Sequence, residues 1–447
     1  MRRHVWELFF ICVRLIRYRS WKGRYRYMKK RILAVTLYLI LTLPMMTTLT
    51  GCAKTAPDAD LMLGIEANTV TTDTDISGDS AIAVTDLAVR LFQQSVEDGK
   101  NMLISPLSII NALAMTANGA EGKTLSQMEE VFGLSVSELN EYLYAYIKAL
   151  PAGEKYKLSI ANSIWFKDEE SFTVEPGFLQ ANADWYGAGL YKVPFNNSTL
   201  SDINNWVEEN TDGMIKDILD SIPKAAVMYL VNALAFDAEW NNIYYDYQVR
   251  EGVFTKEDGT QQQAELMYSM EHQYLEDTYA VGFIKYYADK KYAFAALLPD
   301  ENISVIDYVA SLTGEKLASM LANPADKKVN TAIPKFESEN SIELNDILKA
   351  MGMTDAFDYT VSDFSGIGSS KDGNLYISRV LHKTFIAVDE KGTKAGAATV
   401  VEMEAGSAMI EPEEIKTVYL DRPFVYMLID CEANLPVFIG TVMDISD

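Results

Sequence analysis

The segment that most constrains the fold lies late in the chain. A strand-like run ends at Val388, and residues 388–399 read Val-Asp-Glu-Lys-Gly-Thr-Lys-Ala-Gly-Ala-Ala-Thr. Alanine and glycine occupy places where a permanent strand carries bulky side chains, and residues 400–414 contain neither an aromatic nor a basic side chain. The pattern indicates a segment with two alternative positions: an exposed loop, or an extra strand whose small side chains fit between existing strands.

The rest of the body, residues 80–447, reads as one large domain. No internal repeat and no second linker interrupts it, so we expect a single core rather than a chain of modules. Strand-like apolar runs lie at residues 158–166, 228–236, 292–298, 376–388, 424–429 and 437–442. The last two runs are apolar on both faces, which is typical of strands in the middle of a covered sheet.

Capping residues predict the positions of four helices. Ser105 is a natural N-cap and Pro106 suits the first helical position, so a helix should run from there to Ala117. The other helices are expected from a capping box at Thr124 to Gly133, from a cap at Ser341 to Gly352, and over residues 203–218. The expected fold class is therefore α+β, with a sheet-rich core.

The first 51 residues read as an export signal behind an extension. Met28 begins a positive stretch, an apolar run covers residues 32–46, and Leu-Thr-Gly-Cys ends at Cys52. These are the parts of a secretory signal, and the ending resembles the lipobox of bacterial lipoproteins, in which the cysteine is lipidated and becomes the first mature residue. The alternative is an uncleaved anchor helix, for which the apolar run is short.

These features divide the chain into four parts. We expect residues 1–27 to be an extension before the true start, 28–51 the lipoprotein signal peptide, 52–79 a flexible acidic and Thr-rich tether, and 80–447 the folded domain. Under either interpretation of the signal the body lies outside the cytoplasm. The protein is thus expected to be exported, and either lipid-anchored through Cys52 at the bacterial cell surface or secreted.

Charge and the rarer residue types exclude several classes of function. The net charge is −24, and residues 1–51 hold eleven of the 39 basic residues and one of the 63 acids, which leaves −34 on the remainder. Nucleic-acid binding needs clustered Lys and Arg, so it is not expected. Three cysteines, Cys12, Cys52 and Cys431, cannot make a disulfide framework, and three histidines give little basis for a metal site.

Motifs for an enzyme are largely missing. The sequence has no Gly-x-Ser-x-Gly, no phosphate loop, no Cys-x-x-Cys and no His-Glu-x-x-His. Ser221 and Lys224 match the Ser-x-x-Lys of penicillin-interacting enzymes, but Pro223 breaks the helix that would bring them onto one face, and the companion motifs are missing. We interpret this stretch as a loop that leads into a strand.

The chain closely resembles the serpin family. From Asn101, Asn-Met-Leu-Ile-Ser-Pro-Leu-Ser-Ile is similar to a serpin segment, and so are Ile-Pro-Lys-Phe at 333–336 and Arg-Pro-Phe at 422–424. Further similar segments follow in the family's order at 158–163, 203–208, 211–213, 230–234 with Trp240, 351–353 with Phe357, 363–366, the hinge at Glu390, and 438–440. The resemblance implies a serpin fold: a large mixed or antiparallel central sheet, additional sheets, eight or nine helices and an exposed reactive loop.

For function, the resemblance implies a protease inhibitor rather than an enzyme, without a cofactor. A serpin offers its loop as bait; after cleavage and acyl-enzyme formation the loop inserts into the sheet with the protease attached. The resemblance assigns the hinge of this loop to Glu390, Gly392, Thr393, Lys394, Ala395, Gly396, Ala397, Ala398 and Thr399. Because strand side chains alternate, an inward Thr393 is followed inward only by small residues, and Lys394 falls on the outward set, although the family usually has an acid there.

The resemblance also implies two control regions and a cleavage site. A polar cluster beneath the sheet, the shutter, is assigned to Ser105, Ser108, Asn232 and His382, and the breach, where the loop first inserts, to Trp240. The family's usual loop length places the cut bond at Gly406-Ser407, within a window from Ala405 to Met409. The uncharged, non-aromatic window favours an elastase-like serine protease with a small apolar pocket; a subtilisin-like target, or a glutamate-specific one through Glu404, stays open.

Two other functions remain open at this point. One is a non-inhibitory binding protein with the serpin fold, and a remoter one is a serine acyl-enzyme. The inhibitor interpretation predicts a monomer whose acidic body attracts a cationic protease, although acidity also serves solubility alone.

Overall fold

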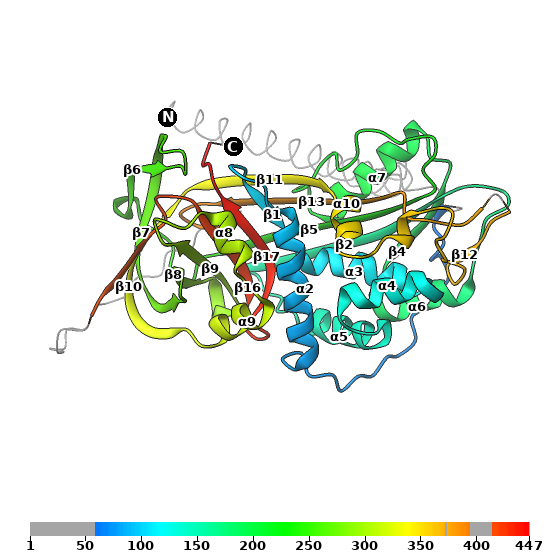
Figure 1. Ribbon diagram of the computed structural model, residues 1–447, viewed down its shortest axis with the longest axis horizontal. Coiled ribbons are helices and arrows are strands. Elements are labelled where there is room, and N and C mark those ends of the chain that lie inside the picture. Colours follow the sequence, from blue (N-terminus) through cyan, green and yellow to red (C-terminus); the bar gives the residue numbers. More distant parts are fainter. Residues whose placement is uncertain (1–58, 372, 394–413, 447) are drawn as a thin grey trace, which may run out of the picture. The chain divides into compact units, whose positions relative to one another are not determined.

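The computed structural model describes residues 59–371, 373–393 and 414–446. Within these residues the chain forms nine α-helices and three sheets, of nine, six and two strands (Figure 1). The predicted α+β class, with a large central sheet, additional sheets and eight or nine helices, is confirmed.

The six-stranded sheet is the central one for function. Its strands, in spatial order, are β11 (Phe336–Glu343), β13 (Arg379–Val388), β14 (Gly392–Thr393), β5 (Met228–Glu239), β2 (Tyr156–Lys167) and β4 (Gly189–Val193). Neighbouring strands are antiparallel except at two places, β2 with β4 and β5 with β13. The parallel contact of β5 with β13, which we call the seam, pairs 379–384 with 229–234, and the short β14 lies between the same two strands at one end.

Helices cover both faces of this sheet. On one face lies α3 (Pro106–Ala117), whose residues are all buried, and on the other lies α7 (Asn197–Asn210), which packs Ile203 and Val207 against Trp165 and Tyr229. Figure 1 shows α3 among the helices below the long strands and α7 above them. Covered on both sides, β5 buries nearly every residue, as its uninterrupted apolar run predicts.

The nine-stranded sheet holds the last two strands of the chain in its interior, next to the edge strand β1. Its spatial order is β1 (Met102–Ile104), β17 (Leu435–Val442), β16 (Phe424–Asp430), β9 (Tyr292–Pro299), β8 (Ala280–Tyr286), β7 (Gln261–Glu276), β10 (Ala325–Pro334) and β15 (Lys416–Tyr419), with β6 (Val249–Thr255) on β7. Every residue of β16 and β17 is buried, so the prediction that these two runs lie inside a covered sheet is correct.

The remaining elements complete the body. They are α2 (Asp79–Ser95), α4 (Gly122–Phe132), α5 (Val136–Ala149), α6 (Pro176–Tyr186), α8 (Val305–Ala310), α9 (Gly314–Ala322), α10 (Asn345–Ala350), and the strand pair β3 (Thr173–Val174) and β12 (Gly368–Ser369). Of the helices in the described part of the chain, none has the length and apolarity that crossing a membrane requires.

Helix starts differ from the prediction at three places. Ser105 does cap α3 and accepts a hydrogen bond from the Ser108 N–H at 3.3 Å. Thr124, however, lies inside α4 and is buried, because that helix starts two residues earlier; its end at the left-handed Gly133 is as predicted. Ser341 belongs to β11 rather than to a cap. The helix expected over 203–218 is α7, which begins earlier, at Asn197, and ends at Asn210.

Residues 59–78, which the sequence assigns to a flexible tether, make defined contacts with the body. The Leu61 N–H donates to the Leu190 carbonyl of β4 at 2.9 Å, and the Asn68 side chain and N–H both donate to the Asp184 carboxylate. Leu61 and Ile76 also pack against the core. Composition misses these contacts because each rests on a few residues in an otherwise polar stretch.

Candidate functional site

The candidate site begins where β14 lies between β13 and β5. Gly392 is paired with Glu239, and Thr393 lies between Ala238 of β5 and Val388 of β13. A Cβ atom on Gly392 would stand 1.9 Å from the Ala238 carbonyl oxygen, so only glycine fits this close approach. The first two positions of an extra strand are therefore already filled.

Thr393 points into the core. It has no exposed surface, and its hydroxyl lies 2.5 Å from the hydroxyl of Tyr287. Burial raises the pKa of Tyr287, so this phenol stays protonated. The Tyr287 ring in turn stacks on Trp240, with 4.4 Å between centroids and 8° between planes. The inward position assumed for Thr393 is what the structure has.

Trp240 and Tyr244 hold the turn before β14. The Trp240 backbone N–H donates to the Lys391 carbonyl and its indole N–H donates to the Asp389 carbonyl, both at 2.8 Å. The Tyr244 N–H donates to the Glu390 carbonyl at 2.8 Å. Residues 389–393, which we call the root of the loop, are thus fixed through three consecutive carbonyls.

Glu390 adds an ion pair to the root. Its carboxylate lies 2.9 Å from the ammonium of Lys335, and hydrogen bonding by Lys335 is the main cause that lowers the pKa of Glu390. Both side chains are about one third exposed. An ion pair exposed to this degree contributes little to stability, so the carbonyl contacts dominate at the root.

The four predicted shutter residues lie together in the middle of the seam. His382 of β13 is the register partner of Asn232 of β5, and both are buried above the start of α3. The Ser105 N–H donates to His382 Nε2 at 2.9 Å, so the ring proton is on Nδ1, which donates to Asn232 Oδ1. Ser108 Oγ also donates to that oxygen, at 3.4 Å. Their control of sheet opening stays a prediction.

This cluster is neutral and incompletely paired. Burial lowers the pKa of His382 to about 3, so the imidazole carries no charge at neutral pH. Among the described residues the Asn232 amide nitrogen finds no hydrogen-bond partner. A buried polar atom without a partner costs about 1–3 kcal/mol, so a group that could bond to it would be stabilised here.

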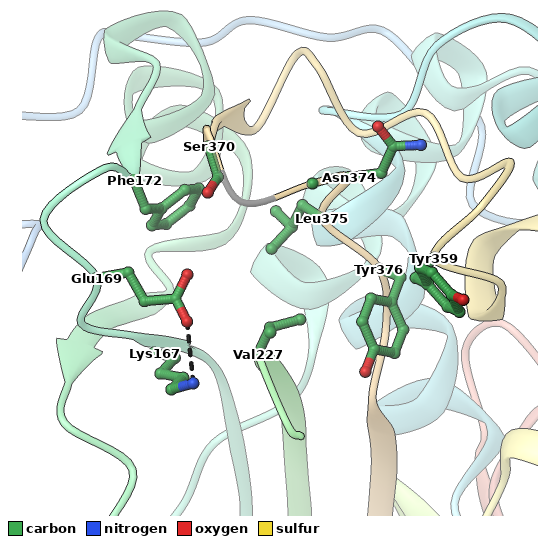
Figure 2. Close-up of a pocket in the computed structure, with 10 residues that line it drawn as sticks. Lys167, Glu169, Phe172, Val227, Tyr359, Ser370, Asn374, Leu375 and Tyr376 are labelled. Carbon is green, nitrogen blue, oxygen red and sulfur yellow. Dashed lines mark ion pairs between the residues drawn. The ribbon is translucent and has the colours of Figure 1, made fainter. Parts of the chain in front are cut away.

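A cavity of about 230 Å³ lies beyond the other end of the seam. Val227, directly before β5, and Leu375 and Tyr376, before β13, form one side of it. Figure 2 shows them facing Phe172 and the ion pair of Lys167 with Glu169. The seam therefore runs from a filled end at β14 to an open end at this cavity.

Several predicted site residues lie outside the described residues. They are Cys52, Lys394, Ala395, Gly396, Ala397, Ala398, Thr399 and the bond window from Ala405 through Gly406 and Ser407 to Met409. Within the described ranges, no group of three or more His, Cys, Asp or Glu side chains could hold a metal ion.

The sequence alone missed three residues of the site: Tyr287, Tyr244 and Lys335. Each contacts the root from a different connection between strands, and Tyr287 is 106 positions away from Thr393 in the sequence. No local spacing could identify them. The only signal was the density of aromatic residues around Trp240 and residues 286–287.

Comparison with known proteins agrees with this geometry. The family model described as serpin (serine protease inhibitor) matches residues 82–445. An uncharacterized serpin-like protein of Thermococcus kodakarensis is 31% identical over 373 residues, which cover 82% of this chain and 85% of that protein.

Two solved structures of one thermophilic serpin, Tengpin, are also similar. Its native state superposes with a TM-score of 0.82 at 50% identity, covering 86% of this chain and 99% of the other. Its latent state gives 0.73 at 46% identity, covering 84% and 100%. The family match spans most of the chain, and the central sheet and the root lie within it; the chain therefore belongs to the serpin family, whose members are in general serine protease inhibitors.

Proposed function

We propose that this protein inhibits an elastase-like serine protease by inserting its cleaved loop into the seam. The observation that carries the proposal is the register of β14. Its two residues run antiparallel to both β5 and β13, while these two strands run parallel to each other beyond it. An extra strand that continued β14 would replace one parallel contact by two antiparallel ones. The higher TM-score with native than with latent Tengpin supports a protein in which the seam awaits this strand.

The register also gives the place that each loop residue would take. Thr393 lies opposite Ala238, so every step forward along the loop moves one step back along β5. Ala395 would then lie opposite Phe236, and Ala397 opposite Leu234. The inward positions as far as residue 405 are Ala395, Ala397, Thr399, Val401, Met403 and Ala405. All of them are uncharged, so insertion would bury no charge.

Thr399 would arrive at the shutter. By the same register it lies between Asn232 and His382, whose mutual hydrogen bond must break when the strands separate. Its hydroxyl can both donate and accept, so it can accept from the Asn232 amide nitrogen. Insertion would thus satisfy a polar atom for which the described residues offer no partner.

The outward charges would also be matched. Lys394 would lie opposite Asp237 of β5, and Glu402 would lie between Tyr229 and Arg379. Opposite charges directly across a sheet stabilise it by roughly 0.2–1 kcal/mol. The inserted strand would also gain about ten ladder hydrogen bonds at ~0.5–1.5 kcal/mol each. Together with the charge pairs, these bonds would drive insertion. The acylated end at Gly406 would then emerge past the seam, on the side of the cavity in Figure 2.

The target rests on the window from Ala405 to Met409. Its small or apolar uncharged residues suit the small, apolar specificity pocket of elastases, and subtilisin-like proteases are the second class to test. The acidic body would speed association with a cationic protease, with a rate that falls as salt increases.

The test is to mix the protein with pancreatic or neutrophil elastase and to look for a denaturant-resistant complex of summed mass. We expect such a complex, together with a slower association at high salt. Cleavage without a complex would contradict inhibition and favour a serpin-fold binding protein. Slow turnover by the protein itself would favour an acyl-enzyme, and a rate independent of salt would reduce the charge to a role in solubility.

We further propose that the protein is exported and anchored through a lipid on Cys52. Metabolic labelling with a fatty-acid analogue should mark the wild type and not Cys52→Ala, which should leave the membrane fraction. Equal labelling of both would contradict the anchor.

A further inference from the structure

A buried ion pair lies next to the root, on strands of the other sheet. Lys285 of β8 is 2% exposed and Glu271 of β7 is 13% exposed, with 2.9 Å between Nζ and Oε1. Among the ion pairs of the described residues, the next most buried lysine, Lys383, is 12% exposed. Removing two charges from water costs several kcal/mol, so such a pair is weak evidence of stability. Its position calls for another explanation.

The ammonium of Lys285 is held against the side chains of the two residues that donate hydrogen bonds to the root, Trp240 and Tyr244. Its Nζ lies 4.3 Å from the ring centre of Tyr244 and 5.4 Å from that of Trp240, and it donates to the Asn242 carbonyl at 3.3 Å. Cation–π contacts are stronger for a desolvated ammonium than for one exposed to water. Burial alone would lower the pKa of Lys285, but Tyr244 and Glu271 outweigh it and raise that pKa, so the group is charged.

Glu271 is fixed in turn. Ser269 Oγ donates to the same carboxylate oxygen at 2.7 Å and lies 2.9 Å from Thr331 Oγ1 on β10. The ammonium therefore has a rigid partner on one side and the aromatic faces of Trp240 and Tyr244 on the other. Apolar side chains of the same size would fill the space but could not attract both ring faces and a backbone carbonyl at once.

This contact continues directly to the loop. Trp240 and Tyr244 are the residues that donate to the Asp389, Glu390 and Lys391 carbonyls. The Asn241 N–H donates to the Tyr286 carbonyl, next to Lys285. One buried cation thus contacts Trp240, Asn242 and Tyr244, in the segment that carries all three of these donors to the root.

We propose that the Lys285–Glu271 pair is a positioning element of the inhibitory reaction, which keeps the root in register so that insertion starts from Thr393 without delay. The inference rests on the proposed function. Trapping is a race between insertion and hydrolysis of the acyl-enzyme, so a root that has lost its register gives hydrolysis more time. The expected consequence is more cleaved inhibitor per trapped protease, with little change in the association rate, which the exposed bait residues set.

The test compares two doubly substituted proteins. Lys285→Met/Glu271→Gln removes the pair without leaving a buried charge. The matched control is Lys316→Met/Asp277→Asn: that pair is joined at 2.8 Å, its lysine also faces two tyrosine rings, at 5.5 and 5.7 Å, and it lies on α9 and the β7–β8 turn, away from the root. Glu271→Gln alone is the milder variant if the double variant fails to fold.

Two measurements test the role of the Lys285–Glu271 pair, and only the first of them depends on elastase being the target protease. With elastase, we expect the stoichiometry of inhibition to rise at least threefold for the Lys285 variant and to stay unchanged for the control. Independently, the loop is cut with thermolysin, which forms no acyl-enzyme, and the rate at which the nicked protein gains heat resistance is followed. This rate should fall severalfold for the Lys285 variant only.

The outcomes are distinguishable. If the wild type traps no elastase but gains heat resistance after cutting, the proposed target fails while the thermolysin measurement still decides the role of Lys285. Equal gain rates for wild type and the Lys285 variant would overturn the inference. A shift of the same size in the control would reduce the pair to general stability and would overturn it as well.

Discussion

The seam between β5 and β13 is held in opposite ways at its β14 end and at its middle. At the β14 end, Thr393 is enclosed between two strands and bonded to Tyr287, and three carbonyls of the root accept hydrogen bonds. At the middle, two parallel strands meet around His382 and Asn232, with a neutral imidazole and an amide nitrogen that has no hydrogen-bond partner in the described part of the chain.

This difference indicates a sheet that is aligned at one end and weak further along. Antiparallel ladders are slightly more stable per residue than parallel ones, so the middle is where a new strand gains most. In the proposed insertion, the β14 end would set the register of that strand before it forms. Four measurements can break or sharpen this comparison, taken from the largest expected effect to the smallest.

Thr393→Arg should have the largest effect. The side chain at this position has no exposed surface and faces Tyr287, so a guanidinium would be buried without a charge partner, at a cost of several kcal/mol. We expect the variant to be cleaved as a substrate, with at least a tenfold loss of trapped complex. Complex formation at the wild-type level would show that the β14 end does not govern insertion.

The middle should respond to pH through His382. Unfolded, this side chain takes up a proton below about pH 6.5, whereas folded it does so only near 3. Its contribution to stability is therefore complete above about pH 7 and is lost as the pH falls from there toward 3. At pH 5 the loss is about 2 kcal/mol.

The measurement is the free energy of unfolding at pH 7 and pH 5, by denaturant titration, for the wild type and for His382→Gln. The variant should lack about 2 kcal/mol of the wild type's decrease. Equal decreases would show that His382 is not the group that makes the middle of the seam pH-sensitive.

Thr399→Val tests the partner for Asn232. The substitution keeps the size of the side chain but removes the hydroxyl, so the cleaved, inserted form should lose about 1–2 kcal/mol relative to the wild type while the uncut protein is unchanged. Differential scanning calorimetry of cut and uncut protein gives both values. Thr399→Ser, which retains the hydroxyl, is the control, and a loss of the same size in both variants would contradict the assigned register.

Lys394→Glu should have the smallest effect. In the inserted form the substitution would place a second carboxylate directly opposite that of Asp237, at a cost of up to about 1 kcal/mol. This outward face of the sheet is the one away from Tyr287. We expect trapping to persist, with a cleaved form that is slightly less heat-resistant and more sensitive to salt. Loss of inhibition as severe as that of Thr393→Arg would show that the two faces of the loop are not distinct.

Strands were more predictable than helix starts. The six apolar runs correspond to β2, β5, β9, β13, β16 and β17. In β5, β9, β16 and β17 nearly every residue is buried, and burial on both faces demands an apolar stretch that is visible in the sequence. Thr124 and Ser341 failed as caps because a cap preference is only a tendency: Thr and Ser also occur inside helices and on strands, and tertiary contacts decide between these places.

The residues of the candidate site also fall into those that the sequence predicted and those that it did not. The shutter and hinge residues were found through the family resemblance, and their proximity depends on strand register, which a local pattern does not contain. Lys285 and Tyr287 were not singled out at all, because a lysine or a tyrosine in an apolar run gives no indication that it faces the root of a loop more than 100 residues away. Pairings over such distances are decided by the folded sheet.

The buried place of β16 and β17 has a consequence for how the molecule is made. These two strands, from Phe424 to Val442, join the edge strand β1 to β9 in the nine-stranded sheet, although they follow all other strands in the sequence. A chain still leaving the ribosome lacks them, so the part of the core that they bury stays open while residues 394–413 have already been made. For the proposed insertion, maturation becomes a matter of timing: the late hairpin must dock before residues 394–413 enter the seam, and a chaperone that delays this segment would raise the yield of the uninserted form.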